Sequence, residues 1–321
     1  MEIGLITDSL SSRSFDEVLG VAADLGLGSI ELPTGNWSEA PHLDLDALLD
    51  SEAERLAYLG KIAQAGLRVS ALNANGNQLH PVSGPEQDLV LRKTIRLARL
   101  MDVPTVVCMS GLPGAAGDST PNWVTSSWPP ENLAILEHQW EQVALPYWRE
   151  LAGFAQEHGV KLAIEPCSTQ LVYNAATAKR LIDAVGSEWV GINLDPSHLM
   201  AMGADIPSVI RALAGTIMHV HAKDVRLNAP VVAANGLPDG TGMTQWQQRA
   251  WNYVTLGLGH PAGEAFWADF VYELRAAGYD GTLNIEHEDV LVNSEEGVRR
   301  AAGLLRRVAL QGEPDWKPAQ V

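Results

Sequence analysis

Cysteine is scarce in this sequence of 321 residues, which contains only Cys108 and Cys167. Two cysteines cannot form the several crosslinks of a disulfide framework, so the chain is not a small disulfide-stabilised domain. Positive charge is also scarce, because 22 lysines and arginines face 39 aspartates and glutamates, giving a formal net charge of −17. Nucleic acids and anionic membranes bind clustered Lys and Arg, so this balance argues against both as partners.

Long apolar runs and targeting signals are missing as well. No apolar stretch approaches the ~20 residues that a membrane-spanning helix needs. The amino terminus, MEIGLIT, is too short and too acidic to be a signal peptide, so the expected location is cytoplasmic. No glycine-rich phosphate-binding motif is present; the glycines between residues 84 and 117 indicate loops.

Short apolar runs alternate with helix-length segments along the whole chain. The eight expected strands are residues 3–7, 29–32, 68–72, 105–109, 161–165, 190–194, 217–221 and 282–286. The eight expected helices are residues 14–25, 51–65, 86–100, 131–158, 175–185, 206–213, 265–277 and 295–308. Alternation of this kind implies a parallel sheet, and eight units of roughly 30 residues predict a closed (β/α)₈ TIM barrel. We expect this α/β barrel over residues 1–310 as a single domain, followed by a tail at residues 311–321.

The two longest loops, residues 110–130 and 222–264, both follow strands. They are therefore expected on the C-terminal face of the barrel, where the active sites of this fold are built. Catalytic and metal-binding residues are therefore expected at the carboxyl ends of the strands.

Four successive strands end on, or just before, a carboxylate or an imidazole: Glu165, Asp195, His221 and Glu286. These side chains are ligands for divalent metals. Stepping back two residues reaches the same face of each strand, and the residues there are small or polar: Ala163, Asn193, His219 and Asn284. The residues between are apolar: Ile164, Leu194, Val220 and Ile285. The polar face is thus predicted to point into the barrel, with the four ligands at its mouth.

The polar residues one layer down, Asn193, His219 and Asn284, are expected to orient the ligands from beneath. Three carboxylates and one imidazole favour Mn²⁺, with Mg²⁺ or Co²⁺ as alternatives, over a structural Zn²⁺. Glu31, at the end of the second strand, is either an extra substrate contact or a solvated side chain.

The strand ends resemble the xylose isomerase-like superfamily of sugar isomerase and epimerase barrels. The resemblance lies in Ile-Glu165-Pro, Leu-Asp195-Pro-Ser-His198, His219-Val-His221-Ala-Lys-Asp and Ile-Glu286-His-Glu-Asp. It implies that the four ligand positions bind metal and that the two glutamates also transfer protons. It further implies that His198, and more loosely Arg226, contact substrate oxygens. A second glutamate that the epimerases carry after strand five has no counterpart in Ser168-Thr-Gln-Leu-Val.

A narrower resemblance is to the α subunits of bacterial C-glycoside deglycosidases. It is carried by the loop Gly76-Asn-Gln-Leu-His80-Pro directly after Asn75, the run Trp128-Pro-Pro-Glu-Asn-Leu, the helix at residues 138–148 and Gly257-Leu-Gly-His260. It implies a Mn²⁺-dependent lyase that breaks the sugar–aglycone C–C bond of a 3-keto C-glycoside, working in a hetero-oligomer with a small β subunit. Asn75, His80, Trp128 and His260 are then candidate substrate contacts.

His138 completes the set of catalytic candidates. It lies in the second turn of the long expected helix at residues 131–158, whose first turns should overhang the active-site mouth, and Pro146 is expected to kink this helix. The imidazole could exchange a proton with the aglycone at neutral pH, or it could simply pack on the surface.

These observations predict an enzyme that removes a proton beside a metal-bound ketone of a keto-sugar. Loss of a leaving group would make it a lyase, whereas reprotonation would make it an isomerase or epimerase. An alternative of another class is a non-catalytic subunit that binds metal and sugar to support a partner.

Overall fold

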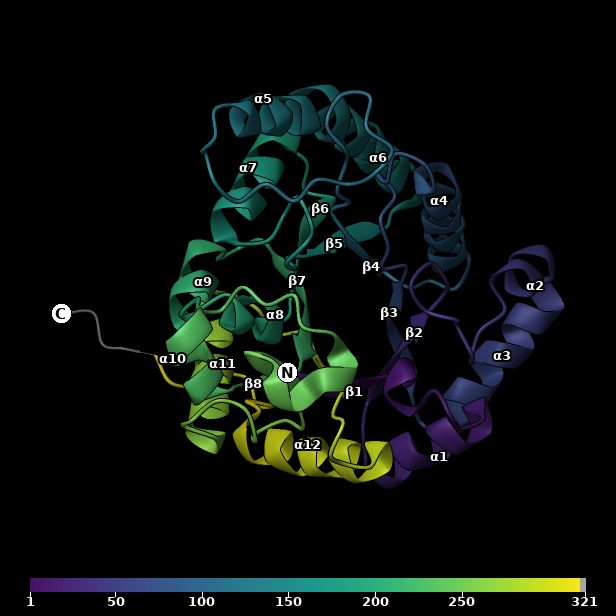
Figure 1. Cartoon of the computed structure of the whole chain (residues 1–321). Helices are drawn as coiled ribbons and strands as arrows, with labels where there is room; N and C mark the ends of the chain where they lie inside the picture. The colour runs from purple at the N-terminus through teal and green to yellow at the C-terminus, as the bar shows by residue number, and fades with distance from the viewer. Residues whose placement is uncertain (318–321) are drawn as a thin grey trace.

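The computed structural model describes residues 1–317 and forms a closed barrel of eight parallel strands surrounded by helices (Figure 1). The strands follow the order β1-β10-β7-β6-β5-β4-β3-β2 around the barrel. Their bounds are β1 (Glu2–Ile6), β2 (Ser29–Pro33), β3 (Arg68–Asn73), β4 (Thr105–Met109), β5 (Lys161–Glu165), β6 (Val190–Leu194), β7 (Ile217–Ala222) and β10 (Thr282–Ile285). The predicted (β/α)₈ barrel is confirmed.

The helices follow the strands as the alternation predicts, and several of the loops carry short extra ones. The helices are α1 (Phe15–Asp24), α2 (Leu45–Asp50), α3 (Glu52–Gln64), α4 (Gly84–Leu100), α5 (Glu131–Glu137), α6 (Leu145–His158), α7 (Ala175–Val185), α8 (Pro196–Ala201), α9 (Ile206–Ala212), α10 (Ala229–Asn235), α11 (Glu264–Ala276) and α12 (Ser294–Val308). Past α12, residues 309–317 form neither helix nor strand. The tail predicted at residues 311–321 lies partly outside the described residues.

Strand alternation divides the buried side chains as the sequence predicts. The apolar face of each strand packs outward against the helices, in one large core that includes Ile164, Leu194, Val220 and Ile285. A small separate cluster of Ala71, Val107 and Ala163 fills the barrel interior. Polar side chains are buried as well and form the layer that supports the site, among them Glu31, Asn193, His219 and Asn284.

Gly4 on β1 shows how tightly that polar layer is packed. A Cβ atom at this position would collide with the side-chain oxygen of Asn284 on the neighbouring strand β10. Only glycine leaves room there, because every other residue would place a carbon where the carboxamide lies.

The long helix expected at residues 131–158 is continuous but changes its winding. A π-helical turn, His138–Ala144, joins α5 to α6, and the Leu145 N–H reaches back five residues to the Trp140 carbonyl. Pro146 lies in the first turn of α6. Proline has no N–H to donate, and the wide turn directly before α6 lies where the helix must do without that hydrogen bond.

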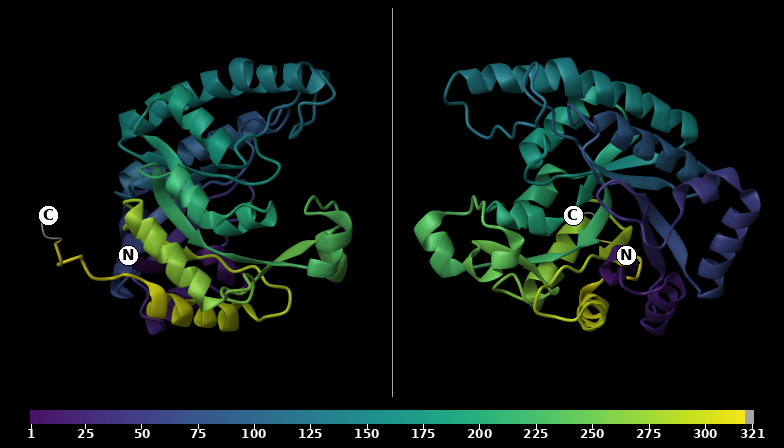
Figure 2. Two further views of the ribbon diagram at one scale, coloured as in Figure 1. Left: turned by 90° about the vertical axis from the view of Figure 1, so that its left-hand side faces the viewer. Right: turned by 45° about the vertical axis from the view of Figure 1, so that its right-hand side comes forward.

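The excursion after β7 contains two strands that the sequence did not predict. β8 (Asp224–Leu227) and β9 (Trp251–Val254) pair antiparallel, with Val225 opposite Tyr253. Residues 228–250 separate them, too many to give the local turn signal of a tight hairpin, which is why eight strands were expected rather than ten. Both views in Figure 2 show this excursion and the segment around α5 projecting from the same end of the barrel.

Candidate metal centre and active site

The four side chains predicted as metal ligands converge at the carboxyl ends of β5, β6, β7 and β10. These strands are consecutive around the barrel. One ligand atom from each of Glu165, Asp195, His221 and Glu286 lies within 4.8 Å of the others. The first three side chains are buried and Glu286 is half-buried. Carboxylates and an imidazole at this spacing can share one cation.

Local sequence explains how Asp195 presents an oxygen to this centre. Asp195 is the N-cap of α8, and its Oδ1 accepts the Ser197 N–H at 2.8 Å. Pro196 follows as the first helical residue, where its missing N–H costs nothing. The helix start therefore fixes the carboxylate and leaves Oδ2 without a hydrogen bond, 3.3 Å from Nε2 of His198.

Two carboxylate oxygens of this centre lack hydrogen bonds, and a divalent cation would supply the missing contacts. Asp195 Oδ2 and Glu286 Oε2 are both buried, and among the described residues neither has a hydrogen-bond partner. Glu286 Oε2 lies 2.9 Å from Nδ1 of His221, without hydrogen-bond geometry. Carboxylates gathered in a buried site are costly unless a cation neutralises them. The His221 imidazole does so when it is protonated, because burial opposes its charge but Glu31, Glu165 and Glu286 raise its pKa well above the usual value. A metal ion on Nδ1 would replace that proton. The residues present thus fit a divalent metal.

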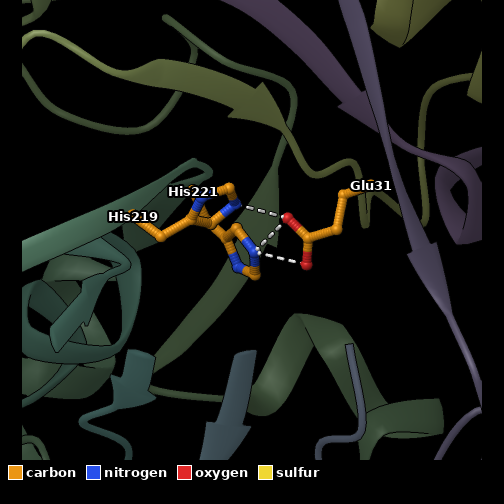
Figure 3. Close-up of side chains that lie close together, drawn as sticks. All are labelled: Glu31, His219 and His221. Carbon is orange, nitrogen blue, oxygen red and sulfur yellow. Dashed lines mark hydrogen bonds and ion pairs between the residues drawn. The ribbon is translucent and has the colours of Figure 1, made fainter. Parts of the chain in front are cut away.

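Beneath the centre, Glu31 binds two histidines across the barrel interior (Figure 3). Its Oε2 lies 2.7 Å from Nε2 of His219, and its Oε1 lies 3.0 Å from Nε2 of His221. Glu31 is fully buried. Burial raises the pKa of this carboxyl, but the His221 and His219 imidazoles outweigh it and hold the pKa well below its usual range.

This contact sets which nitrogen of His221 can bind a metal. When Nε2–H donates to Glu31, Nδ1 is left on the side of the ligand carboxylates, where Asn193 Nδ2 also lies 3.2 Å away. Asn193, predicted to orient the ligands, donates to Glu165 Oε2 at 2.8 Å. Asn284 donates to Glu31 Oε2 at 3.2 Å, so it acts on the ligands through Glu31.

Glu165 is held by neutral or histidine donors. Asn75 Nδ2 donates to Oε2 at 3.2 Å, and Nε2 of His198 lies 2.8 Å from Oε1. Burial opposes ionisation of Glu165, but His221 and the hydrogen bond from His198 lower its pKa well below the usual value.

Glu286 is held instead by a buried lysine. Lys223 Nζ lies 2.8 Å from Glu286 Oε1 and 2.9 Å from Glu288 Oε1, and the ammonium also sits 4.3 Å from the centre of the Tyr253 ring. Burial opposes ionisation of Glu286, but Lys223 and His221 lower its pKa to about 2. The two glutamates of the site therefore have different partners.

A cavity of about 270 Å³ opens over the centre. Its lining includes Glu165, Glu286, His198, Lys223, Asn75, Cys167, Tyr253, Glu288 and Trp37. Tyr253 reaches it from the β8–β9 hairpin and places its hydroxyl 2.8 Å from Nδ1 of His198. Cys167 Sγ lies 3.5 Å from the same nitrogen. The cavity thus combines polar groups for hydroxyls with an exposed indole for a sugar face.

Asn75 and His198 are the predicted substrate contacts that line this cavity. Apart from the metal ligands, five predicted catalytic or substrate-binding residues are not part of its described lining: His80, Trp128, His138, Arg226 and His260. Nδ1 of His80 accepts the N–H groups of Val82 and Ser83 at the start of α4, and Nδ1 of His260 accepts that of Ala262. These two histidines therefore have local structural roles that spacing alone did not reveal.

The remaining three lie on the rim or surface. Arg226 is exposed on β8, and Trp128 is 75% exposed in the loop before α5. His138 is half-buried in the π-helical turn. Their predicted roles stay predictions.

Sequence reasoning gave no role to Lys223 and Tyr253 and left Glu31 undecided. Lys223 follows His219 and His221 at the same two-residue step, so strand parity was a signal that could have placed it at the mouth. Tyr253 reaches the cavity only through the β8–β9 hairpin, and Glu31 contacts His221, which is 190 positions away in the sequence. Local sequence patterns therefore could not predict the place of either residue.

The sequence model described as xylose isomerase-like TIM barrel matches residues 19–308. The chain belongs to this family. It is 42% identical to the protein YfiH of Bacillus subtilis (strain 168) over 316 residues, which span 97% of this chain and 100% of YfiH.

Solved structures of the same fold include enzymes and a metal-bound protein. A structure of IolI with a bound zinc atom superposes with a TM-score of 0.67 at 19% identity, covering 96% of this chain and 98% of that one. L-ribulose 3-epimerase gives a TM-score of 0.64 at 19% identity, covering 98% and 99%. Within residues 1–317, no helix has both the length and the apolar character needed to cross a membrane.

Proposed function

We propose that this protein is a divalent-metal-dependent lyase that removes a proton beside the ketone of a 3-keto glycoside and eliminates the aglycone. The observation that carries the proposal is the unequal environment of the two glutamates. Glu286 is paired with the buried Lys223 ammonium, whereas Glu165 is bound by an imidazole and two carboxamides. The choice of Mn²⁺ and of a glycoside rests on the resemblance described above.

The different partners of Glu165 and Glu286 favour elimination over epimerisation. Epimerisation by two bases requires each carboxylate in turn to hold a proton, one on each face of the substrate. The pKa of each glutamate is depressed, but Glu165 contacts the His198 imidazole, a group that can exchange a proton with it, whereas Glu286 contacts the Lys223 ammonium. A carboxylate next to a buried ammonium stays ionised, which disfavours the proton-holding role for Glu286. Elimination needs one base and a separate donor for the leaving group, and this site offers such a division.

In the proposed reaction Glu165 takes the proton from C2 of the 3-keto sugar. The bond from C1 to the aglycone breaks as the C1–C2 double bond forms, and the departing aglycone atom gains a proton. His198 contacts Glu165 and Tyr253, so it lies where it can hold a substrate hydroxyl or return a proton. A bound divalent ion would supply Lewis acidity at the ketone, which makes the neighbouring C–H more acidic.

Lys223 and Glu288 keep Glu286 in place during this chemistry, and Tyr253 closes the cavity from the side. Trp37, 55% exposed, provides a flat apolar surface at the cavity edge. Such surfaces bind sugar or aromatic rings through their faces.

The proposal includes a small β subunit on the C-terminal face, as the resemblance implies. Two apolar side chains near α5 support it: Trp128 is 75% exposed and Leu133 is 55% exposed. Neighbouring exposed apolar side chains of this size are typical of surfaces that bind another protein. His138 lies in the same region and stays a candidate through that partner.

Ketose epimerisation is the second candidate, because Glu165 and Glu286 do line one cavity and the fold is shared with an epimerase. The deciding experiment incubates the Mn²⁺-loaded protein with 3-keto C- and O-glycosides of a phenol and, separately, with free ketoses. We expect release of the phenol from the glycosides. Interconversion of ketoses without phenol release would establish the epimerase instead.

A further inference from the structure

The two halves of the barrel contribute different side chains to the cavity over the metal centre. The four metal ligands come from the ends of β5, β6, β7 and β10, which are consecutive strands, so β4, β3, β2 and β1 form the opposite half. Four apolar side chains of the cavity lining belong to this opposite half: Ile6 at the end of β1, Pro33 at the end of β2, Met109 at the end of β4 and Trp37 in the loop after β2. The metal ligands and an apolar surface therefore face the same space from different sides.

The loop after β2 is held in place on both sides of Trp37. The Trp37 N–H donates to the Asn75 carbonyl at 3.0 Å, and Asn36 Nδ2 donates at 3.0 Å to the carbonyl of the residue that follows β3. On the other side, Ser38 Oγ donates to Asp8 Oδ2 at 2.5 Å, and Asp8 itself lines the cavity. Both sequence neighbours of Trp37 are therefore fixed by hydrogen bonds, so the backbone that carries the indole is not free to move.

The same loop has a backbone shape that most residues avoid. Gly35, Asn36 and Ala40 have φ angles of 146°, 62° and 48°. Positive φ is unfavourable for residues with a Cβ atom, although asparagine tolerates it better than most. Strained conformations of this kind cluster at active sites and ligand-binding sites, where the surrounding structure holds them. The loop keeps this shape although Trp37, its largest side chain, is 55% exposed and adds little to the core.

Asn75 connects this loop to the proposed catalytic base. Its carbonyl accepts the Trp37 N–H, and its Nδ2 donates to Glu165 Oε2 at 3.2 Å. The Asn75 N–H donates to Asn73 Oδ1 at 2.9 Å, which fixes Asn75 at the end of β3. Two hydrogen bonds therefore relate the backbone of Trp37 to the carboxylate. In the proposed reaction Glu165 takes the proton from C2, and the aglycone is attached to the next carbon, so the aglycone lies in or at the mouth of the cavity that Trp37 lines.

We propose that Trp37 determines substrate specificity by stacking on the aglycone, so that the protein selects aryl glycosides over alkyl glycosides. This inference rests on the proposed function and adds the chemical class of the leaving group. The sugar lies against the metal half of the cavity, and the aglycone ring lies against the indole on the opposite half. Contact between two aromatic faces contributes binding beyond the burial of apolar area, by a factor of about two to ten, whereas a saturated ring gains from burial alone.

Calorimetric titration of the Mn²⁺-loaded, full-length protein with phenyl β-glucoside and cyclohexyl β-glucoside tests the proposal. The two probes have similar size, but only the phenyl ring is flat, and neither carries the ketone, so neither is turned over. We expect saturable binding of phenyl β-glucoside below roughly 10 mM, about two- to tenfold tighter than that of cyclohexyl β-glucoside. Absence of saturation, or equal affinity for the two probes, would overturn the assignment.

Three variants assign the preference to Trp37. Trp37→Ala should abolish the preference for the phenyl probe, and Trp37→Phe, which keeps an aromatic face, should retain most of it. Trp316→Ala, the same change at a tryptophan that is 77% exposed after α12, is the matched control. An unchanged preference in Trp37→Ala would overturn the assignment and show that the indole faces solvent or a protein partner.

Kinetics separates this inference from the proposed reaction. With the 3-keto glycoside of a phenol, Trp37→Ala should raise KM for phenol release and leave kcat nearly unchanged, because stacking holds the ground state and the transition state alike. Phenol release with an unchanged KM would leave the elimination standing and overturn only the role of Trp37. A wild-type protein that prefers the phenyl probe but releases no phenol would overturn the elimination and not the aromatic specificity.

Discussion

Glu31 Oε1 lies 3.0 Å from Nε2 of His221, and this bond crosses the barrel interior, because β2 and β7 are not neighbours in the sheet. The carboxylate orients the imidazole so that Nδ1 faces the other three ligands. Glu31→Ala should therefore weaken Mn²⁺ binding by about 10–100-fold. The dissociation constant can be measured by electron paramagnetic resonance of free Mn²⁺. Glu157→Ala, the same change at an exposed position on α6, is the control, and an unchanged constant in Glu31→Ala would show that Glu31 is only structural.

Glu165 is proposed to take the proton from the carbon beside the ketone. Glu165→Gln keeps the size and polarity of the side chain but removes the base, so we expect solvent-deuterium exchange at that carbon to fall by ~10²–10⁴-fold. Glu286→Gln should weaken metal binding and retain more exchange at saturating Mn²⁺. NMR of substrate in D₂O measures both. Exchange that survives in Glu165→Gln and disappears in Glu286→Gln would reverse the two roles.

Lys223 is 3% exposed and compensates the charge of Glu286. Lys223→Met leaves that carboxylate without its cation, and breaking a buried pair costs about 3–5 kcal/mol. We expect a loss toward the lower end of this range in urea unfolding of the metal-free protein, because Glu288, the other partner of Lys223, is largely exposed. Lys61→Met, which breaks the exposed pair with Asp16, should cost less than ~1 kcal/mol. Equal losses in the two variants would contradict the account.

The same pair makes a pH-dependent contribution to stability. Burial opposes ionisation of Glu286, but Lys223 and His221 depress its pKa from 4.5 to about 2. A carboxyl with a depressed native pKa binds protons more readily when unfolded, so its contribution is present above about pH 4.5 and is lost as the pH falls toward 2. Urea unfolding of the metal-free protein between pH 6 and 3 should show a smaller decline in Lys223→Met than in the wild type. Parallel pH profiles would exclude the contribution.

The strand ends could be predicted from the sequence because side-chain alternation has a period of two and parallel strands keep their register. That reasoning brought Glu165, Asp195, His221 and Glu286 together and placed Asn193 and Asn284 beneath them. It could not show that Glu31 binds His219 and His221, because that contact depends on closure of the barrel. It also could not foresee the β8–β9 hairpin, whose strands are joined by a long segment.

Three predicted histidines show where sequence reasoning assigned residues to the site that do not line its cavity. His80 and His260 were singled out because they lie in motifs that carry the narrower resemblance, and His138 because its helix was expected to overhang the active-site mouth. His80 and His260 accept backbone N–H groups nearby, a local role that any polar loop residue can take. Residue type and position along the chain did not separate these from His198, which reaches the cavity because α8 begins directly at Asp195.

A crystal grown with Mn²⁺ and measured at a wavelength with strong manganese anomalous scattering tests the central claim most directly. The account predicts one anomalous peak at the mouth of the barrel, about 2.0–2.6 Å from an atom of each of Glu165, Asp195, His221 and Glu286. A second group that could hold an ion, Glu31 with His219 and His221, lies deeper in the barrel. A peak there with none at the mouth, or no peak at either place, would contradict it.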